Sequence, residues 1–113
     1  FVERFDANSV LYITRAMDYF DLSKQFKGGI IEAFKDQKTQ FLVISFESDW
    51  LYTTTDNKDI VIALNASGAD VSYSEIITDK GHDSFLLEEP KFLKTLKSFI
   101  DSMYDKFKNE KRI

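Results

Sequence analysis

Two polar segments, each following an expected β-strand, hold the residues best suited to acid–base chemistry. Residues 47–52 include Asp49, and residues 79–84 include His82, the one histidine of the chain. The carboxyl ends of parallel neighbouring strands meet at one edge of a sheet, where open α/β proteins bind ligands. We therefore expect Asp49 and His82 to meet, although they lie 33 positions apart in the sequence. A carboxylate that holds one imidazole nitrogen leaves the other free to act as a base.

The alternative is that both residues are ordinary solvated loop residues. Asp83, next to His82, would then serve only as the N-cap of a short helix over 85–87. These alternatives differ in one geometric respect, which is whether Asp49 and His82 come within hydrogen-bond reach of each other.

A strand–helix–strand unit is expected to position the two segments. Residues 41–46 form an apolar run rich in β-formers, typical of a strand buried on both faces. Residues 71–77 begin with the alternating run Val-Ser-Tyr-Ser-Glu, typical of a strand near a sheet edge. The connection between them is long enough for a crossover between parallel strands, which is right-handed in nearly all proteins.

The crossover is expected to contain a helix. Ile60, Val61 and Leu64 supply its apolar positions, and either Thr55 or Asp56 is expected as its N-cap. Gly68 is placed to end it in a left-handed conformation.

Helices are also expected at both ends of the chain. A helix capped by Asp6 or Asn8 is apolar almost all round, so we expect it to be covered on more than one side. A second helix, over about 22–36, has an apolar residue at every fourth position, with Gly28-Gly29 interrupting it.

The last segment predicts an amphipathic helix that begins near Pro90. Its lysines favour a solvated face over an anion-binding patch. Its apolar stripe is formed by Phe92, Leu93, Leu96, Phe99, Ile100, Met103, Tyr104 and Phe107.

The expected fold class is α/β, with two parallel strands, four helices and an incomplete sheet. Strand 41–46 needs a second neighbour, which would be either a strand upstream of this sequence or a strand of another subunit. Because the chain begins with Phe1 and not with Met, we expect it to be a piece of a longer protein.

Composition excludes several classes of function. The 113 residues include no Cys, one His and four Gly, which leaves no thiolate or multi-His metal site and no glycine-rich phosphate loop. The net charge of −4 argues against nucleic-acid binding. No apolar run reaches the roughly 18 residues of a membrane span.

The order acid-then-histidine, each after a late strand, is that of the α/β-hydrolases, in which a nucleophilic Ser comes first. Six ordered strings extend this likeness, and together they resemble the C-terminal third of the homoserine O-acetyltransferases, a family of α/β-hydrolase-fold acyltransferases. The strings are Arg-Phe-Asp-Ala-Asn-Ser from residue 4, Leu-Tyr and Ala-Met-Asp from 11 and 16, Ser-Asp-Trp-Leu-Tyr from 48, Gly-Ala-Asp-Val-Ser-Tyr from 68, and Gly-His-Asp-Ser-Phe-Leu-Leu-Glu from 81.

The resemblance implies roles for three residues. Asp49 and His82 would complete a Ser–Asp–His triad, and Asp83 would hold the amino group of L-homoserine. The acyl donor would be acetyl-CoA, acting as a substrate, with no resident cofactor and no metal. The nucleophilic Ser would belong to a missing N-terminal part, so the 113-residue chain alone is expected to be inactive.

The resemblance also implies an organisation and a setting. Residues 1–38 would be the end of a helical lid and a return helix, and residues 39–113 the C-terminal βαβα part of the hydrolase core. The lid would form the contact of a homodimer, and the enzyme would be cytoplasmic and serve methionine biosynthesis. A homoserine or serine O-succinyltransferase would use the same Asp and His. A non-catalytic interaction domain would leave these two residues apart.

Overall fold

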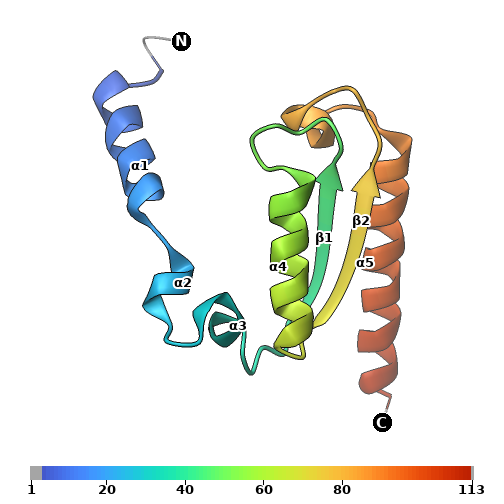
Figure 1. Ribbon diagram of the computed structural model, residues 1–113. Helices are drawn as coiled ribbons and strands as arrows, with labels where there is room; N and C mark the ends of the chain where they lie inside the picture. The colour runs from blue at the N-terminus through green and yellow to red at the C-terminus, as the bar shows by residue number, and fades with distance from the viewer. Residues whose placement is uncertain (1–3, 113) are drawn as a thin grey trace.

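The computed structural model describes residues 4–112 and contains a two-stranded parallel sheet flanked by helices (Figure 1). Strand β1 spans Gln40–Phe46 and strand β2 spans Asp70–Ile76. They pair in parallel, from Gln40 opposite Asp70 to Phe46 opposite Ile76. Helix α4, Thr54–Ala66, makes the crossover between them. The predicted βαβ unit is therefore confirmed, with each strand starting one residue earlier than expected.

The carboxyl ends of both strands lie at the same edge of the sheet (Figure 1). Burial is concentrated there, because Ser45 and Phe46 are buried at the end of β1 and Ile76 at the end of β2. The rest of β1 is half-buried, so the expectation of a strand buried on both faces is wrong for the described part of the chain. The reason is that β1 has β2 as its one described strand neighbour.

The N-terminus of α4 departs from the expected cap. Its N-cap is Thr53, and neither Thr55 nor Asp56 occupies that position. The Thr53 side chain accepts a hydrogen bond from the Asp56 N–H, and the Asp56 carboxylate accepts one from the Thr53 N–H. This reciprocal capping box satisfies two backbone donors at the helix start. At the other end Gly68 has φ 82°, as predicted.

The segment before the sheet consists of separate helices. Helix α1, Ala7–Tyr19, is capped by Asp6, as one of the two expectations had it. The expected helix over 22–36 is wrong, because the chain forms two short helices, α2 at Leu22–Gln25 and α3 at Gly29–Ala33. Gly29 has φ 71°, a conformation that a continuous right-handed helix excludes.

Helix α1 stands apart from the sheet and has no buried residue (Figure 1). The expectation that it is covered on more than one side is therefore not met among residues 4–112. Its large apolar side chains are exposed, and they include Val10, Leu11, Tyr12, Ile13, Met17 and Tyr19. The predicted boundary between residues 38 and 39 lies in the coil between α3 and β1.

Helix α5, Pro90–Glu110, follows a short 3₁₀ helix, η1, at His82–Leu86. Pro90 stands at its first turn, as predicted. The Phe92 ring contacts the Phe46 ring, with centroids 5.8 Å apart, so α5 packs onto the sheet close to the ends of the strands. Among the helices that the structure describes, none is both long enough and apolar enough to cross a membrane.

Candidate active site

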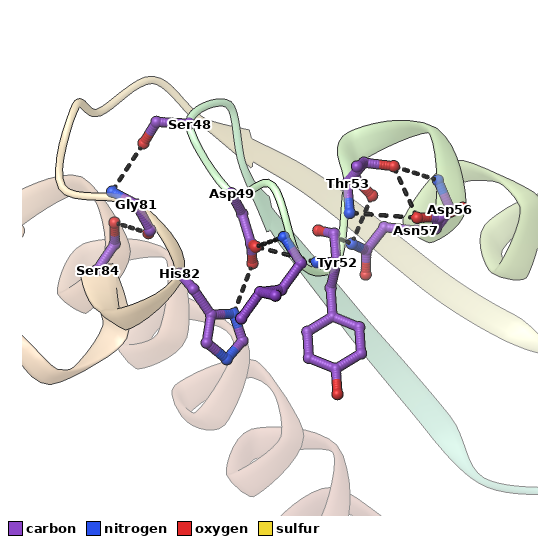
Figure 2. A network of polar contacts seen from close by, with 10 residues as sticks. Ser48, Asp49, Tyr52, Thr53, Asp56, Asn57, Gly81, His82 and Ser84 are labelled. Atoms are coloured by element: carbon purple, nitrogen blue, oxygen red, sulfur yellow. Dashed lines mark hydrogen bonds and ion pairs between the residues drawn. The ribbon is translucent and has the colours of Figure 1, made fainter. Parts of the chain in front are cut away.

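Asp49 and His82 form a direct side-chain contact at the carboxyl edge of the sheet. The Oδ2 atom of Asp49 lies 2.9 Å from the Nδ1 atom of His82, and Figure 2 shows the two side chains pointing toward each other. Asp49 lies in the turn after β1, and His82 is the first residue of η1. The predicted juxtaposition is therefore confirmed.

The Asp49 carboxylate is held by its own loop as well as by His82. Its Oδ1 atom accepts hydrogen bonds from the backbone N–H groups of Leu51 and Tyr52, at 2.9 and 3.0 Å. Only 7% of Asp49 is exposed. Burial by itself would raise the pKa of Asp49, but the hydrogen bonds from His82, Tyr52 and Leu51 outweigh it and hold the pKa below its ordinary value of 3.8. Asp49 is thus kept as a carboxylate acceptor.

The imidazole of His82 is oriented by this contact and by two aromatic rings. The ring centroids of Tyr52 and Phe85 lie 5.1 and 6.2 Å from that of His82. A carboxylate at Nδ1 favours the tautomer in which Nδ1 carries the proton. The Nε2 lone pair is then available to accept a proton from a reacting group.

The pair borders an open pocket of about 330 Å³ at the end of the sheet. Sequence reasoning missed one polar residue of this pocket, Asn57 on α4. Its Nδ2 group donates to the backbone carbonyls of Tyr52 and Thr53, at 3.1 and 2.9 Å, and so fixes the far end of the Asp49 loop (Figure 2). The full lining is Ile44, Phe46, Asp49, Tyr52, Asn57, His82, Phe85 and Phe92.

Asp83 is adjacent to His82 in sequence but lies outside this constellation. Its side chain is exposed, does not line the pocket, and takes part in no hydrogen bond or ion pair among residues 4–112. The alternative that Asp83 is a helix N-cap is wrong, because Gly81 occupies the cap position of η1.

The serines near the pair are engaged elsewhere. Ser45 is buried and shares a 2.7 Å hydrogen bond with the Tyr73 hydroxyl. Ser48 accepts from the Gly81 N–H, and the Ser84 hydroxyl donates to the Gly81 carbonyl. Within the described residues, no group of three or more His, Cys, Asp or Glu side chains is arranged to hold a metal ion. The site is therefore a histidine oriented by a carboxylate, and the hydroxyls of the three nearby serines are hydrogen-bonded to other groups.

Comparison with curated proteins finds close sequence relatives, while no family model matches the chain. The chain is 65% identical over 106 residues to a homoserine O-acetyltransferase of Pelagibacter ubique, which covers 94% of the chain and 28% of that protein. It is 56% identical over 107 residues to the homoserine O-acetyltransferase of Rhodospirillum rubrum, covering 95% of the chain and 27% of that protein. The chain is 57% identical over 102 residues to a homoserine O-acetyltransferase of Rhodopseudomonas palustris, which covers 90% of the chain and 26% of that protein. The chain thus spans little more than a quarter of the length of these relatives.

Proposed function

We propose that this chain, which matches a C-terminal part of the homoserine O-acetyltransferases, supplies the acid and the base of a Ser–Asp–His triad. In this assignment Asp49 orients His82, and His82 acts as the general base. The nucleophilic Ser would come from the portion of the relatives' length that this chain does not span. The observation that carries the proposal is the 2.9 Å contact between Asp49 Oδ2 and His82 Nδ1.

The reaction would transfer an acetyl group in two steps. In the first, His82 Nε2 removes the proton of the Ser hydroxyl while its oxygen attacks the thioester carbonyl of acetyl-CoA. The C–S bond then breaks, and coenzyme A leaves as a thiol with the proton that His82 returns. In the second, His82 removes the proton of the L-homoserine hydroxyl, whose oxygen attacks the acyl-serine. The Ser oxygen leaves and takes the proton back.

Asp49 would serve both steps without losing its own charge. Each time His82 takes a proton, the imidazole becomes a cation, and the neighbouring carboxylate stabilises it. The low pKa of Asp49 suits this role, because the carboxylate stays ionised throughout. We further propose that Asp83 pairs with the ammonium group of homoserine, and that its exposed side chain is the free partner for it.

The exposed apolar surface of α1 also suits the lid and dimer roles that the family resemblance implies. This proposal needs no resident cofactor, since acetyl-CoA is consumed as a substrate.

A chimera tests the function directly. This chain would replace the matching segment of the Pelagibacter ubique relative, to which it is 65% identical over 106 residues. We expect the chimera to release more than one equivalent of coenzyme A per enzyme from acetyl-CoA only when L-homoserine is present. The 113-residue chain alone should release none. In the chimera, His82→Ala should lower kcat by roughly 10⁶-fold, as loss of a triad base does.

The same assay separates the rival functions. Faster turnover with succinyl-CoA, or with serine, than with acetyl-CoA and L-homoserine would contradict the proposed substrates. An active chimera in which His82→Ala has no effect would contradict the triad assignment. The non-catalytic interaction domain required Asp49 and His82 to lie out of reach of each other, and the observed contact does not favour it.

A further inference from the structure

A second contact ties the loop of His82 to the loop of Asp49. The backbone N–H of Gly81 donates to the Oγ atom of Ser48, with N and O 2.9 Å apart (Figure 2). Ser48 directly precedes Asp49, and Gly81 directly precedes His82. Two consecutive residues of one loop therefore bond to two consecutive residues of the other, and the members of each pair lie 33 positions apart.

We propose that Ser48 is a positioning residue for the reaction, and that its hydroxyl holds Gly81 so that the His82 imidazole stays on the Asp49 carboxylate. This inference rests on the proposed function, because it concerns the placement of His82 as a base. Ser48 itself would touch neither substrate.

Gly81 is the residue through which such a constraint can act. Its φ of 72° and ψ of −154° lie in a region that is essentially restricted to glycine. Its carbonyl accepts hydrogen bonds from the Ser84 hydroxyl and from the Ser84 N–H, and Ser84 is fully buried. With the N–H on Ser48, both polar backbone groups of Gly81 are bonded. The direction in which η1 leaves the loop, and with it the start of the His82 side chain, depends on these bonds.

Ser48 can hold Gly81 because backbone hydrogen bonds on both sides of Ser48 fasten its loop to the end of the sheet. The N–H of Glu47 donates to the Ile76 carbonyl, which extends the pairing of the strands by one bond of 3.0 Å. The N–H of Asp49 donates to the Phe46 carbonyl, also at 3.0 Å, and closes a tight turn around Ser48. The residue that carries the acceptor, Ser48, is thus held by backbone hydrogen bonds on both sides. The loop over 77–81 depends on its hydrogen bond to Ser48 to keep its position.

Loss of the Ser48 hydroxyl should change the position of the His82 imidazole and leave the Asp49 carboxylate in place. Asp49 would keep the backbone hydrogen bonds from Leu51 and Tyr52. The N–H of Gly81 would lose its partner in a half-buried loop. A displacement of a catalytic group by about 1 Å can lower the rate by about 100-fold.

The test uses the active chimera with Ser48→Ala, and with Ser48→Thr as the variant that keeps a hydroxyl. Ser102→Ala, at an exposed position of α5, is the matched control. We expect Ser48→Ala to lower kcat by roughly 10- to 100-fold with little change in KM for either substrate. Ser48→Thr should recover most of the rate, and Ser102→Ala should match the parent.

A spectroscopic readout separates positioning from a general effect on the fold. The His82 Nδ1 proton, assigned in the NMR spectrum by its absence in His82→Ala, should exchange with water faster in Ser48→Ala. If Ser48→Ala does not fold, Ser48→Cys keeps the shape with a weaker acceptor and should show the same two changes.

Parent-like kcat and parent-like proton exchange in Ser48→Ala or Ser48→Cys would overturn the inference. Failure of both variants to fold, with Ser48→Thr folded, would also overturn it, since the hydroxyl would then serve the fold. These outcomes are distinct from failure of the proposed function, which appears as an active His82→Ala chimera.

Discussion

The Nδ1 atom of His82 lies 2.9 Å from the Oδ2 atom of Asp49, and the other oxygen of that carboxylate accepts two backbone N–H groups. One side chain thus uses both of its oxygens, one to fix its own loop and one to orient the histidine. The contact joins the ends of two parallel strands, which is where the topology concentrates polar groups.

Replacing Asp49 by Asn should nearly abolish transfer without removing the side chain. The amide can donate to the imidazole and so favours the wrong tautomer, which costs about 10⁴-fold in kcat in comparable triads. Steady-state kinetics of the chimera with acetyl-CoA and L-homoserine provides the measurement. Asp59→Asn, at an exposed position of α4, is the matched control and should retain full activity. Equal activity of the two variants would remove Asp49 from the site.

Replacing Asp83 by Ala should affect the second half of the reaction. If Asp83 pairs with the homoserine ammonium, KM for L-homoserine should rise by about 10-fold or more, as expected for a lost charged partner. Formation of the acetyl-enzyme from acetyl-CoA, measured as a burst of coenzyme A, should be unchanged. Asp79→Ala, in the loop that precedes η1 and also exposed, should leave both steps intact. Unaltered homoserine kinetics in Asp83→Ala would exclude Asp83 from the binding site.

The low pKa of Asp49 predicts a contribution to stability that depends on pH. Because the folded-state pKa lies below the ordinary value of 3.8, folding favours the ionised carboxylate. This contribution is fully present above the ordinary value, and it is lost as the pH falls through the lower, folded-state pKa. The free energy of unfolding of the chimera should therefore fall more steeply than that of its Asp49→Asn variant as the pH is lowered through and below 3.8. If the free energies of unfolding of the two proteins fell in parallel with pH, the lowered pKa of Asp49 would be contradicted.

The cap of α4 can be tested by two neighbouring threonines. Thr53→Ala removes the side chain that accepts from the Asp56 N–H, and it should lower the free energy of unfolding by about 1 kcal/mol. Thr55→Ala should cost less than half of that, because Thr55 is exposed within the first turn and caps nothing. Urea unfolding of both chimeras gives the comparison. A larger loss for Thr55→Ala would place the helix start two residues later.

Much of the architecture around the site follows from local sequence pattern. The apolar run at 41–46 and the alternating run from 71 predict both strands, because side-chain alternation and burial leave a direct signature in residue order. The meeting of Asp49 and His82 follows from one topological rule, that parallel neighbours end at the same edge.

Where two local signals compete, the pattern alone is insufficient. The four-residue apolar spacing over 22–36 indicated one helix, yet the backbone at Gly29 adopts a positive φ and divides it. Thr53, Thr55 and Asp56 are all good cap residues, and the reciprocal bonds between Thr53 and Asp56 select the first of them. In each case the sequence permits more than one backbone conformation, and the contacts of the folded chain select one of them.

The sequence by itself determined that Asp49 and His82 would meet, because an acid and a histidine that follow neighbouring parallel strands lie at the same edge of the sheet. The tertiary structure alone decided how they are held there. The hydrogen bond from the Gly81 N–H to Ser48 joins two loops, and the bonds from Asn57 join helix α4 to the Asp49 loop. The paths of these segments depend on the whole strand–helix–strand unit. The physical reason is that a strand leaves a local pattern of apolar and polar residues in the sequence. A hydrogen bond between two loops depends instead on distances that residue order does not specify.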